Sequence, residues 1–172
     1  MRNKESLRAL QMRLVTRLEA AQHVGASVSW LAVKTGTFNI LIPLAQAGEI
    51  FTAQNITPVP YAAPWFLGVV NSRGVLYGVV DLAGFVHPNT DRLPSDASRL
   101  VSFNADFEIN CALRVDDLAG LRGLESFVET DAPKATDPEY FGKRLQDANG
   151  TVWQEIDLHK LSVCPHFLNI GV

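Results

Sequence analysis

The sequence has few cysteines, no long apolar run and no excess of basic charge. Only Cys111 and Cys164 occur among its 172 residues, in unrelated contexts that lack the spacing of a metal site. No segment approaches the roughly 20 apolar residues that a membrane-spanning helix needs. The charged N-terminal stretch does not resemble a secretory signal. We therefore expect free thiols in a reducing cytoplasm and no direct membrane insertion.

The composition and motifs also argue against nucleic-acid binding and catalysis. The 15 Lys and Arg residues are outnumbered by 18 Asp and Glu residues, and most aromatic residues lie in apolar strand contexts. There is no glycine-rich phosphate loop, metal-ligand cluster or Gly-x-Ser-x-Gly elbow. The neighbours Asp116 and Asp117 suggest a carboxylate dyad, but adjacent side chains on a strand point to opposite faces. We expect no enzyme, no cofactor and no bound metal.

The first predicted element is a helix over residues 5–21, followed by a linker at 23–28. Its apolar residues recur at steps of three and four and form one stripe: Leu7, Leu10, Leu14, Leu18 and Ala21. Arg8, Arg13 and Arg17 lie off this stripe. An apolar stripe packs equally well on its own domain or on a partner, so both interpretations stay open.

From Trp30 onward the pattern changes to short strands. The stretches "SWLAVKT" and "TFNILIPL" predict a strand pair that turns at Gly36. Further strands are predicted in "GEIFTAQ", both halves of "GVVNSRGVLYGVVDL", "RLVSF", "FEINCALRV", "LAGLRGL" and the start of "GTVWQEIDLHKL". Residues 87–98 and 129–140 are predicted loops, and a short C-terminal helix is expected to end before Pro165.

Two stretches resemble each other and predict two related β-lobes. "GVLYGVVDLAGF" begins at Gly74 and "GTVWQEIDLHKL" at Gly150, and each contains an aromatic residue three positions later and then a β-branched–Asp–Leu step. In both, the aspartate (Asp81 or Asp157) stands at a good N-cap position for a short helix. A weaker match sets two triplets side by side: Phe38, Ile40, Leu44 and Phe107, Ile109, Leu113. We expect a double small barrel.

The turn within "GVVNSRGVLYGVVDL" exposes one arginine, Arg73. It follows Asn71 and Ser72 and precedes Gly74, which predicts a tight turn at a lobe surface. An arginine in a turn is usually solvated. Yet a guanidinium held by rigid strands suits an interface, because its planar fork makes several directional hydrogen bonds at once. The local sequence leaves both interpretations of Arg73 open.

Six segments together resemble the CheW family of chemotaxis coupling proteins, from about Trp30 to Phe167: "IPLAQAGEIF", "ITPVP", "PWFLGVVNSRGVLYGVVDL", "RLVSF", "CALRVDDL" and "EIDLHKL". The most specific block, residues 68–82, resembles the family's Gly-x-x-Asn-x-Arg-Gly run and its closing Val-Asp-Leu. Ser72 and Gly78 stand where leucine and proline are common in the family, and these two departures point to its type IV pilus branch.

The resemblance implies an all-β fold of two SH3-like five-stranded β-barrels that share a hydrophobic seam. Residues 29–167 would form this domain, with an added N-terminal helix and linker at 1–28 and a short C-terminal helix. The implied function is a non-catalytic cytoplasmic adaptor, recruited to membrane-bound receptor arrays. It would couple the cytoplasmic tip of a methyl-accepting chemotaxis receptor to the regulatory domain of a CheA-type histidine kinase, in the control of type IV pilus (twitching) motility.

The family's receptor groove lies between the lobes. Carried onto matching positions, the resemblance implies partner-binding roles for Ala47, Glu49, Ile50, Gly68, Asn71, Arg73 and Val115. Apolar strand residues would receive the receptor tip, while Glu49 and Arg73 fix its register through polar contacts. Within this motif, a partner-binding Arg73 is favoured over a solvated one. Asp81 and Asp116 would have structural roles, as caps or turn bonds.

Two other functions stay open beside the adaptor. One is a CheW-like interaction module that binds a different signalling regulator without a kinase partner. The other is a small-barrel enzyme with an unrecognised site, which a deep polar pocket with shifted ionisable groups would favour.

Overall fold

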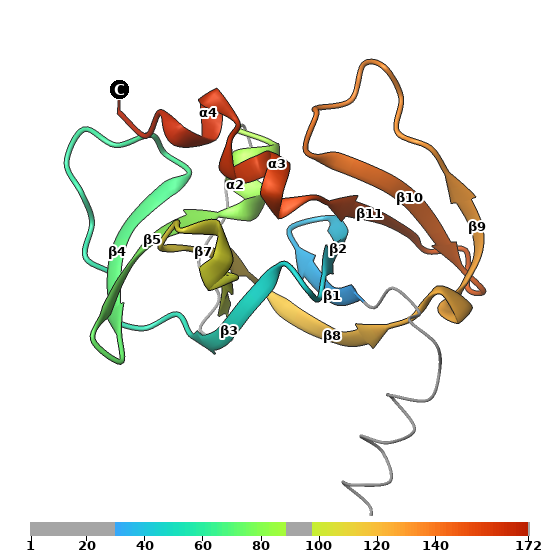
Figure 1. Cartoon of the computed structure of the whole chain (residues 1–172), viewed down its shortest axis with the longest axis horizontal. Helices are drawn as coiled ribbons and strands as arrows, with labels where there is room; N and C mark the ends of the chain where they lie inside the picture. Colours follow the sequence, from blue (N-terminus) through green and yellow to red (C-terminus); the bar gives the residue numbers. More distant parts are fainter. Residues whose placement is uncertain (1–29, 89–97, 172) are drawn as a thin grey trace, which may run out of the picture.

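A computed structural model describes residues 30–88 and 98–171, which are mostly β-structure (Figure 1). The predicted helix at 5–21, its linker and most of the predicted loop at 87–98 lie outside the described residues. Within the described ranges, eleven strands form one sheet of six strands and one of five. No helix of this described part is long and apolar enough to cross a membrane.

The six-stranded sheet takes its strands from both ends of the described chain, in the order β8-β1-β2-β11-β10-β9. Its strands are β1 (Trp30–Thr35), β2 (Phe38–Pro43), β8 (Asp117–Arg122), β9 (Phe127–Asp131), β10 (Phe141–Asp147) and β11 (Val152–Ile156). Neighbours are antiparallel except β2 and β11, which run parallel. The chain therefore begins in this sheet, leaves it and returns.

The five-stranded sheet is built from the middle of the chain, in the order β3-β6-β7-β5-β4. Its strands are β3 (Ala47–Thr52), β4 (Phe66–Ser72), β5 (Val75–Asp81), β6 (Arg99–Phe103) and β7 (Cys111–Val115). The short helices are α2 (Leu82–Val86), α3 (Leu158–Ser162) and α4 (Pro165–Leu168), with 3₁₀ turns η1 (Ala105–Phe107) and η2 (Leu124–Ser126). The predicted C-terminal helix is α3. Pro165 then begins α4, at a position that suits proline.

The two sheets share one strand order, in agreement with the internal sequence match. The order β3-β6-β7-β5-β4 corresponds to β8-β1-β2-β11-β10, with β9 added at the end. Gly78 of β5 lies opposite Cys111 of β7, and Gln154 of β11 lies opposite Ile40 of β2. The weaker match, which sets Ile40 beside Ile109, therefore identifies the equivalent strands but is two residues out of register. A shift of two residues keeps the same face, because side chains alternate along a strand.

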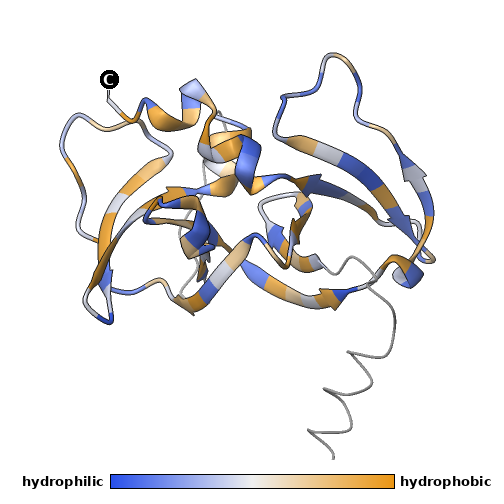
Figure 2. Ribbon diagram, viewed as in Figure 1, coloured by the Kyte–Doolittle hydropathy of each residue, from blue (hydrophilic) through white to orange (hydrophobic). Residues whose placement is uncertain are grey.

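Alternation along the central strands divides the core into three apolar clusters. On β1, Leu31 and Val33 join a cluster shared by both sheets, whereas Trp30 joins a cluster of the six-stranded sheet. On β5, Val80 faces the shared cluster and Val79 faces a cluster of the five-stranded sheet. Figure 2 shows mainly hydrophobic residues along β4 and more hydrophilic residues on β9 and β10. β1 and β5 thus each contribute side chains to two clusters, because successive side chains on a strand point to opposite faces.

Two strands of the six-stranded sheet, β9 and β10, were not predicted from the sequence. β9 overlaps the predicted loop at 129–140, and four of its five residues are exposed. On β10, only Leu145 and Asp147 are buried. Neither strand shows the apolar–polar alternation of a half-buried strand. This lobe therefore has six strands rather than the predicted five.

The chain crosses between the two sheets at Asp116. β7 ends at Val115 and β8 begins at Asp117, so "ALRVDDL" spans two strands rather than the single predicted one. The Asp116 carboxylate accepts a hydrogen bond of 2.7 Å from the Gly36 N–H in the β1–β2 turn. The predicted structural role of Asp116 agrees with this contact, which ties the crossover to the neighbouring turn.

Candidate functional site

Arg73 occupies the tip of the β4–β5 hairpin. Ser72 and Val75 are the last paired residues, so Arg73 and Gly74 form a two-residue turn. Their φ values are both positive, 51° and 85°, as a type I′ turn requires. Glycine adopts this conformation freely, whereas a residue with a side chain is penalised by about 1–2 kcal/mol. The fold therefore places an arginine at a turn position whose backbone conformation favours asparagine or glycine.

Asn71 supports this turn from the end of β4. Its side-chain Oδ1 accepts a hydrogen bond of 3.1 Å from the Gly74 N–H. This bond closes the turn with a side chain, a common use of asparagine beside a tight turn. Asn71 itself is exposed. It therefore orients the hairpin tip and presents its amide group to solvent.

The Arg73 guanidinium extends from the tip to β3. Its Nη1 lies 3.1 Å from Glu49 Oε1, and the two side chains are 81% and 56% exposed. β3 and β4 are the opposite edge strands of the five-stranded sheet, so this ion pair joins the two edges. The Glu49 N–H donates a hydrogen bond of 2.8 Å to the hydroxyl of buried Ser102. The Glu49 backbone is thus fixed, while its carboxylate stays accessible.

Ala47 and Ile50 lie on either side of Glu49 on β3. Ile50 is one of the large hydrophobic residues left exposed, and half-buried Ala47 packs against the shared cluster. Five of the seven predicted site residues therefore lie on β3 and the adjoining hairpin tip. We call them the Arg73 surface: Ala47, Glu49, Ile50, Asn71 and Arg73.

The other two predicted residues are buried. Val115 has no exposed surface and belongs to the shared cluster. Gly68 is buried with a φ of +130°, and a Cβ at this position would collide with the carbonyl oxygen of Thr57. The segment carrying Thr57 runs antiparallel beside β4 here and pairs with Val69 through two backbone hydrogen bonds. Neither Val115 nor Gly68 offers a side chain to a partner, because Val115 fills the core and Gly68 allows the Thr57 backbone to lie close against β4.

The aspartates of the internal sequence match have different roles. Asp157 caps α3 as predicted, because its carboxylate accepts from the N–H groups of His159 and Lys160. Asp81 makes no side-chain cap to α2. Its Oδ1 instead lies 3.6 Å from Nη2 of Arg114, in an ion pair whose side chains are almost completely buried. Sequence reasoning missed Arg114, although an arginine inside the apolar run "CALRV" signals a buried charge that needs a partner.

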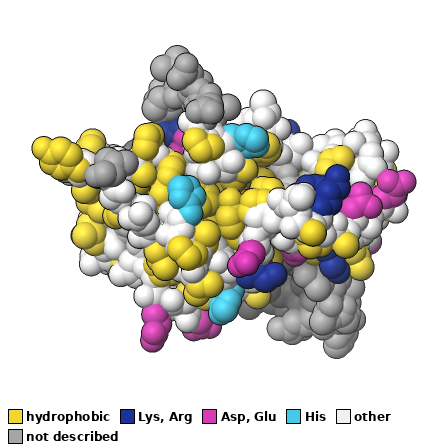
Figure 3. Space-filling model, turned by 90° about the horizontal axis from the view of Figure 1, so that it is seen from above, with side chains coloured by type: hydrophobic (Ala, Val, Ile, Leu, Met, Phe, Trp, Pro, Cys, Tyr) yellow, Lys and Arg dark blue, Asp and Glu magenta, His cyan; other side chains and the backbone are white. Residues whose placement is uncertain are grey.

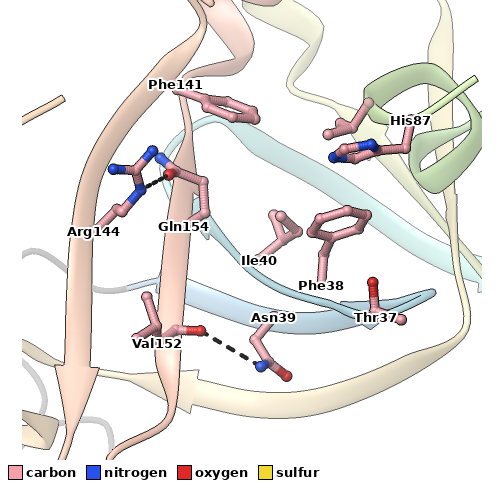
Figure 4. Close-up of a pocket in the computed structure, with 10 residues that line it drawn as sticks. Thr37, Phe38, Asn39, Ile40, His87, Phe141, Arg144, Val152 and Gln154 are labelled. Atoms are coloured by element: carbon pink, nitrogen blue, oxygen red, sulfur yellow. Dashed lines mark hydrogen bonds between the residues drawn. The ribbon is translucent and has the colours of Figure 1, made fainter. Parts of the chain in front are cut away.

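An open pocket of about 310 Å³ lies between the six-stranded sheet and the end of α2 (Figure 4). Its ionisable lining residues are His87, stacked on Phe38, and Arg144. Arg144 is already engaged, because it donates to both carboxylate oxygens of Asp137 and to the side chain of Gln154. The hydrogen bond from the Lys134 N–H is the main cause that lowers the pKa of Asp137, and the positive charge of Arg144 lowers it further. The residues that line this pocket therefore include no carboxylate and no thiol.

The described residues carry no other arrangement typical of catalysis. No group of three His, Cys, Asp or Glu side chains among them could hold a metal ion. Burial raises the pKa of the Cys111 thiol to about 12, so this sulfur is a poor nucleophile.

The face that carries the three short helices has an exposed apolar area (Figure 3). The segment before β4 and the C-terminal end contribute large exposed apolar residues: Val59, Tyr61, Val163, Leu168 and Ile170. A hydrogen bond from the Ala63 N–H to the Ile170 carbonyl ties these two segments together. Sequence reasoning missed this area, because its members lie in irregular segments with no periodic pattern.

Comparison with known proteins matches residues 29–163 to the CheW-like domain. The chain belongs to the CheW-like family. A curated relative, Protein PilI of Pseudomonas aeruginosa, is 29% identical over 164 residues, which cover 93% of this chain and 89% of the relative. The crystal structure of the scaffolding protein TtCheW from Thermoanaerobacter tengcongensis matches with a TM-score of 0.65. The TtCheW sequence is 16% identical to this one, and the match covers 84% of this chain and 99% of TtCheW. This structural likeness confirms the two-sheet CheW fold.

Proposed function

We propose that this CheW-like chain is a non-catalytic adaptor in a chemosensory system that controls type IV pili. Residues 29–167 are its coupling domain. They join the cytoplasmic tip of a methyl-accepting receptor to the regulatory domain of a CheA-type histidine kinase, within receptor arrays. The similarity to PilI over most of both chains supports the assignment to pili.

The observation that carries this proposal is the presentation of Arg73. Its backbone is held in a left-handed conformation that disfavours arginine, and its side chain is largely exposed. A residue that is locally unfavourable yet points into solvent contributes little to folding, which is the pattern expected where a side chain serves recognition. The Arg73 surface combines this guanidinium with the Glu49 carboxylate and an exposed isoleucine. A partner can therefore be aligned by the two charged groups while it makes apolar contact with the isoleucine.

The test is capture of two purified partners, the receptor tip and the kinase regulatory domain, by the full chain and by Arg73→Ala. A matched control is Lys160→Ala, which removes an exposed positive charge from α3. We expect Arg73→Ala to lose receptor capture by about tenfold, the effect of a hot-spot residue worth about 1.4 kcal/mol, and to retain kinase capture. The control should bind both partners normally.

Two results would contradict the proposal in different ways. Capture of the receptor but not of the kinase domain by the unaltered chain would favour a CheW-like module that serves another regulator. Normal capture of both partners by Arg73→Ala would show that Arg73 is solvated and that receptor binding uses another surface.

A further inference from the structure

The corner between β8 and β9 exposes three large apolar side chains. Leu121, Leu124 and Val128 lie within eight consecutive residues and are 65%, 55% and 67% exposed. Single exposed apolar residues are ordinary, but adjacent ones mark a contact surface. We call residues 117–131 the β8–β9 corner.

The corner is also acidic. Its exposed carboxylates belong to Asp117, Glu125, Glu129 and Asp131, and Arg122 is its single basic residue, which gives a net charge of −3. Within the described part of the chain, none of these carboxylates lies within 4.0 Å of a Lys, Arg or His nitrogen. A partner for this corner therefore needs an apolar stripe flanked by positive charge.

Residues 1–29 have this chemistry. They contain five Lys and Arg residues against two Glu, a net charge of +3. The helix predicted at 5–21 carries the stripe of Leu7, Leu10, Leu14, Leu18 and Ala21 with arginines beside it. Its charge and its apolar pattern complement those of the corner.

The chain also enters the fold at this corner. Trp30, the first residue of β1, pairs with Arg122 at the end of β8. Its ring meets Phe127, the first residue of β9, edge to face at 5.8 Å. Eight residues at 22–29 separate Trp30 from the predicted helix and span at most about 26–29 Å. A helix of 17 residues is about 25 Å long. So short a tether gives the helix a high effective concentration at the corner.

We propose that residues 5–21 dock in cis on the β8–β9 corner. The apolar stripe covers Leu121, Leu124 and Val128, and the flanking arginines face the carboxylates. Because β8 and β9 are the edge strands of their sheet, the docked helix also shields an edge from pairing with other chains. This inference is independent of receptor or kinase binding.

Disulfide trapping in the full chain tests the docking. Leu14→Cys is combined with Leu124→Cys, in a Cys164→Ser background that leaves only buried Cys111 in addition. Under mild oxidation we expect a cross-linked monomer that migrates faster on a non-reducing gel. The matched control pairs Leu14→Cys with Val163→Cys, another exposed apolar position, which is 63% exposed. Adding Glu129→Lys and Asp131→Lys should slow trapping at Leu124 at least fivefold.

Each other outcome overturns the proposal. A disulfide-linked dimer would show that the helix binds a second copy. Equal trapping at Val163 would show a tethered helix without a docking site, and no trapping at either position would show a helix that stays away from the corner. Hydrogen exchange gives a second readout on a chain with intact cysteines. Leu10→Asp with Leu14→Asp should deprotect residues 117–131 selectively, and unchanged protection there would contradict docking.

Discussion

The guanidinium of Arg73 and the carboxylate of Glu49 form an ion pair of 3.1 Å that joins the two edge strands of one sheet. Both side chains are exposed, so water and salt screen their attraction, and such pairs are usually worth less than about 1 kcal/mol. The pair therefore does little for folding. It holds a positive and a negative group in fixed positions on the Arg73 surface, where a partner can contact both.

Charge exchange at this pair should separate folding from recognition. Glu49→Arg combined with Arg73→Glu restores opposite charges, so the free energy of unfolding in urea should stay within about 0.5 kcal/mol of the original. Receptor capture should still fall about tenfold, because a partner would meet each charge at the wrong position. Restored capture in the double variant would mean that the pair acts only within the chain.

Asparagine at the hairpin tip should raise stability. Arg73→Asn creates the Asn-Gly sequence that type I′ turns prefer, and the left-handed φ of 51° then costs less. We expect the free energy of unfolding to rise by about 0.5–1 kcal/mol in urea titration while receptor capture falls. A fall in stability would show that the arginine side chain stabilises the turn in some other way.

Two glycines within this hairpin, Gly68 in β4 and Gly74 in the turn, should respond differently to alanine. At Gly68, a Cβ would collide with the Thr57 carbonyl, so Gly68→Ala should lower the free energy of unfolding by about 2–4 kcal/mol. At Gly74, no heavy atom lies within 4 Å of the Cβ position, so Gly74→Ala should cost only about 1 kcal/mol for its positive φ. Equal losses in thermal or urea unfolding would mean that the Thr57 segment moves aside freely.

The two aspartates at equivalent positions of the internal sequence match, Asp81 and Asp157, allow the loss of a buried ion pair to be compared with the loss of a helix cap. Asp81→Ala leaves the Arg114 guanidinium buried without its carboxylate and should cost about 3–5 kcal/mol. Asp157→Ala removes the cap of α3 and should cost about 1 kcal/mol. Urea titration of both variants gives the difference directly. Similar costs would indicate that water reaches Arg114 once Asp81 is removed.

Alkaline pH should destabilise the fold through Cys111. Burial raises the pKa of this thiol to about 12, whereas an unfolded cysteine ionises near pH ~8.5. The folded state thus favours the neutral thiol. Its stabilising contribution is complete below about pH 8.5 and is lost as the pH rises toward 12. Between about pH 8.5 and 10.5, the original chain should lose more stability than Cys111→Ala. Parallel pH curves for the two proteins would contradict this assignment.

The strands and turns with a strong local signal were predictable from the sequence. Alternating apolar residues on each side of Gly36 define the β1–β2 pair, and the repeated glycine and aspartate positions reveal two related lobes. The resemblance of residues 68–82 to the CheW family likewise lies in local sequence. These features depend on side-chain alternation and turn chemistry, which act over a few residues.

Contacts between distant segments were decided only by the tertiary structure. β9 and β10 become strands because they extend a sheet already formed, without an apolar pattern of their own. Val115 is buried because the two sheets pack over it, and the Asp81 carboxylate pairs with Arg114 of the neighbouring strand β7 instead of capping α2. Arg73 reaches Glu49 because the two sheet edges come together. The sequence by itself determined which residues form the hairpin tip, and the packing of the sheets decided which side chains that tip meets.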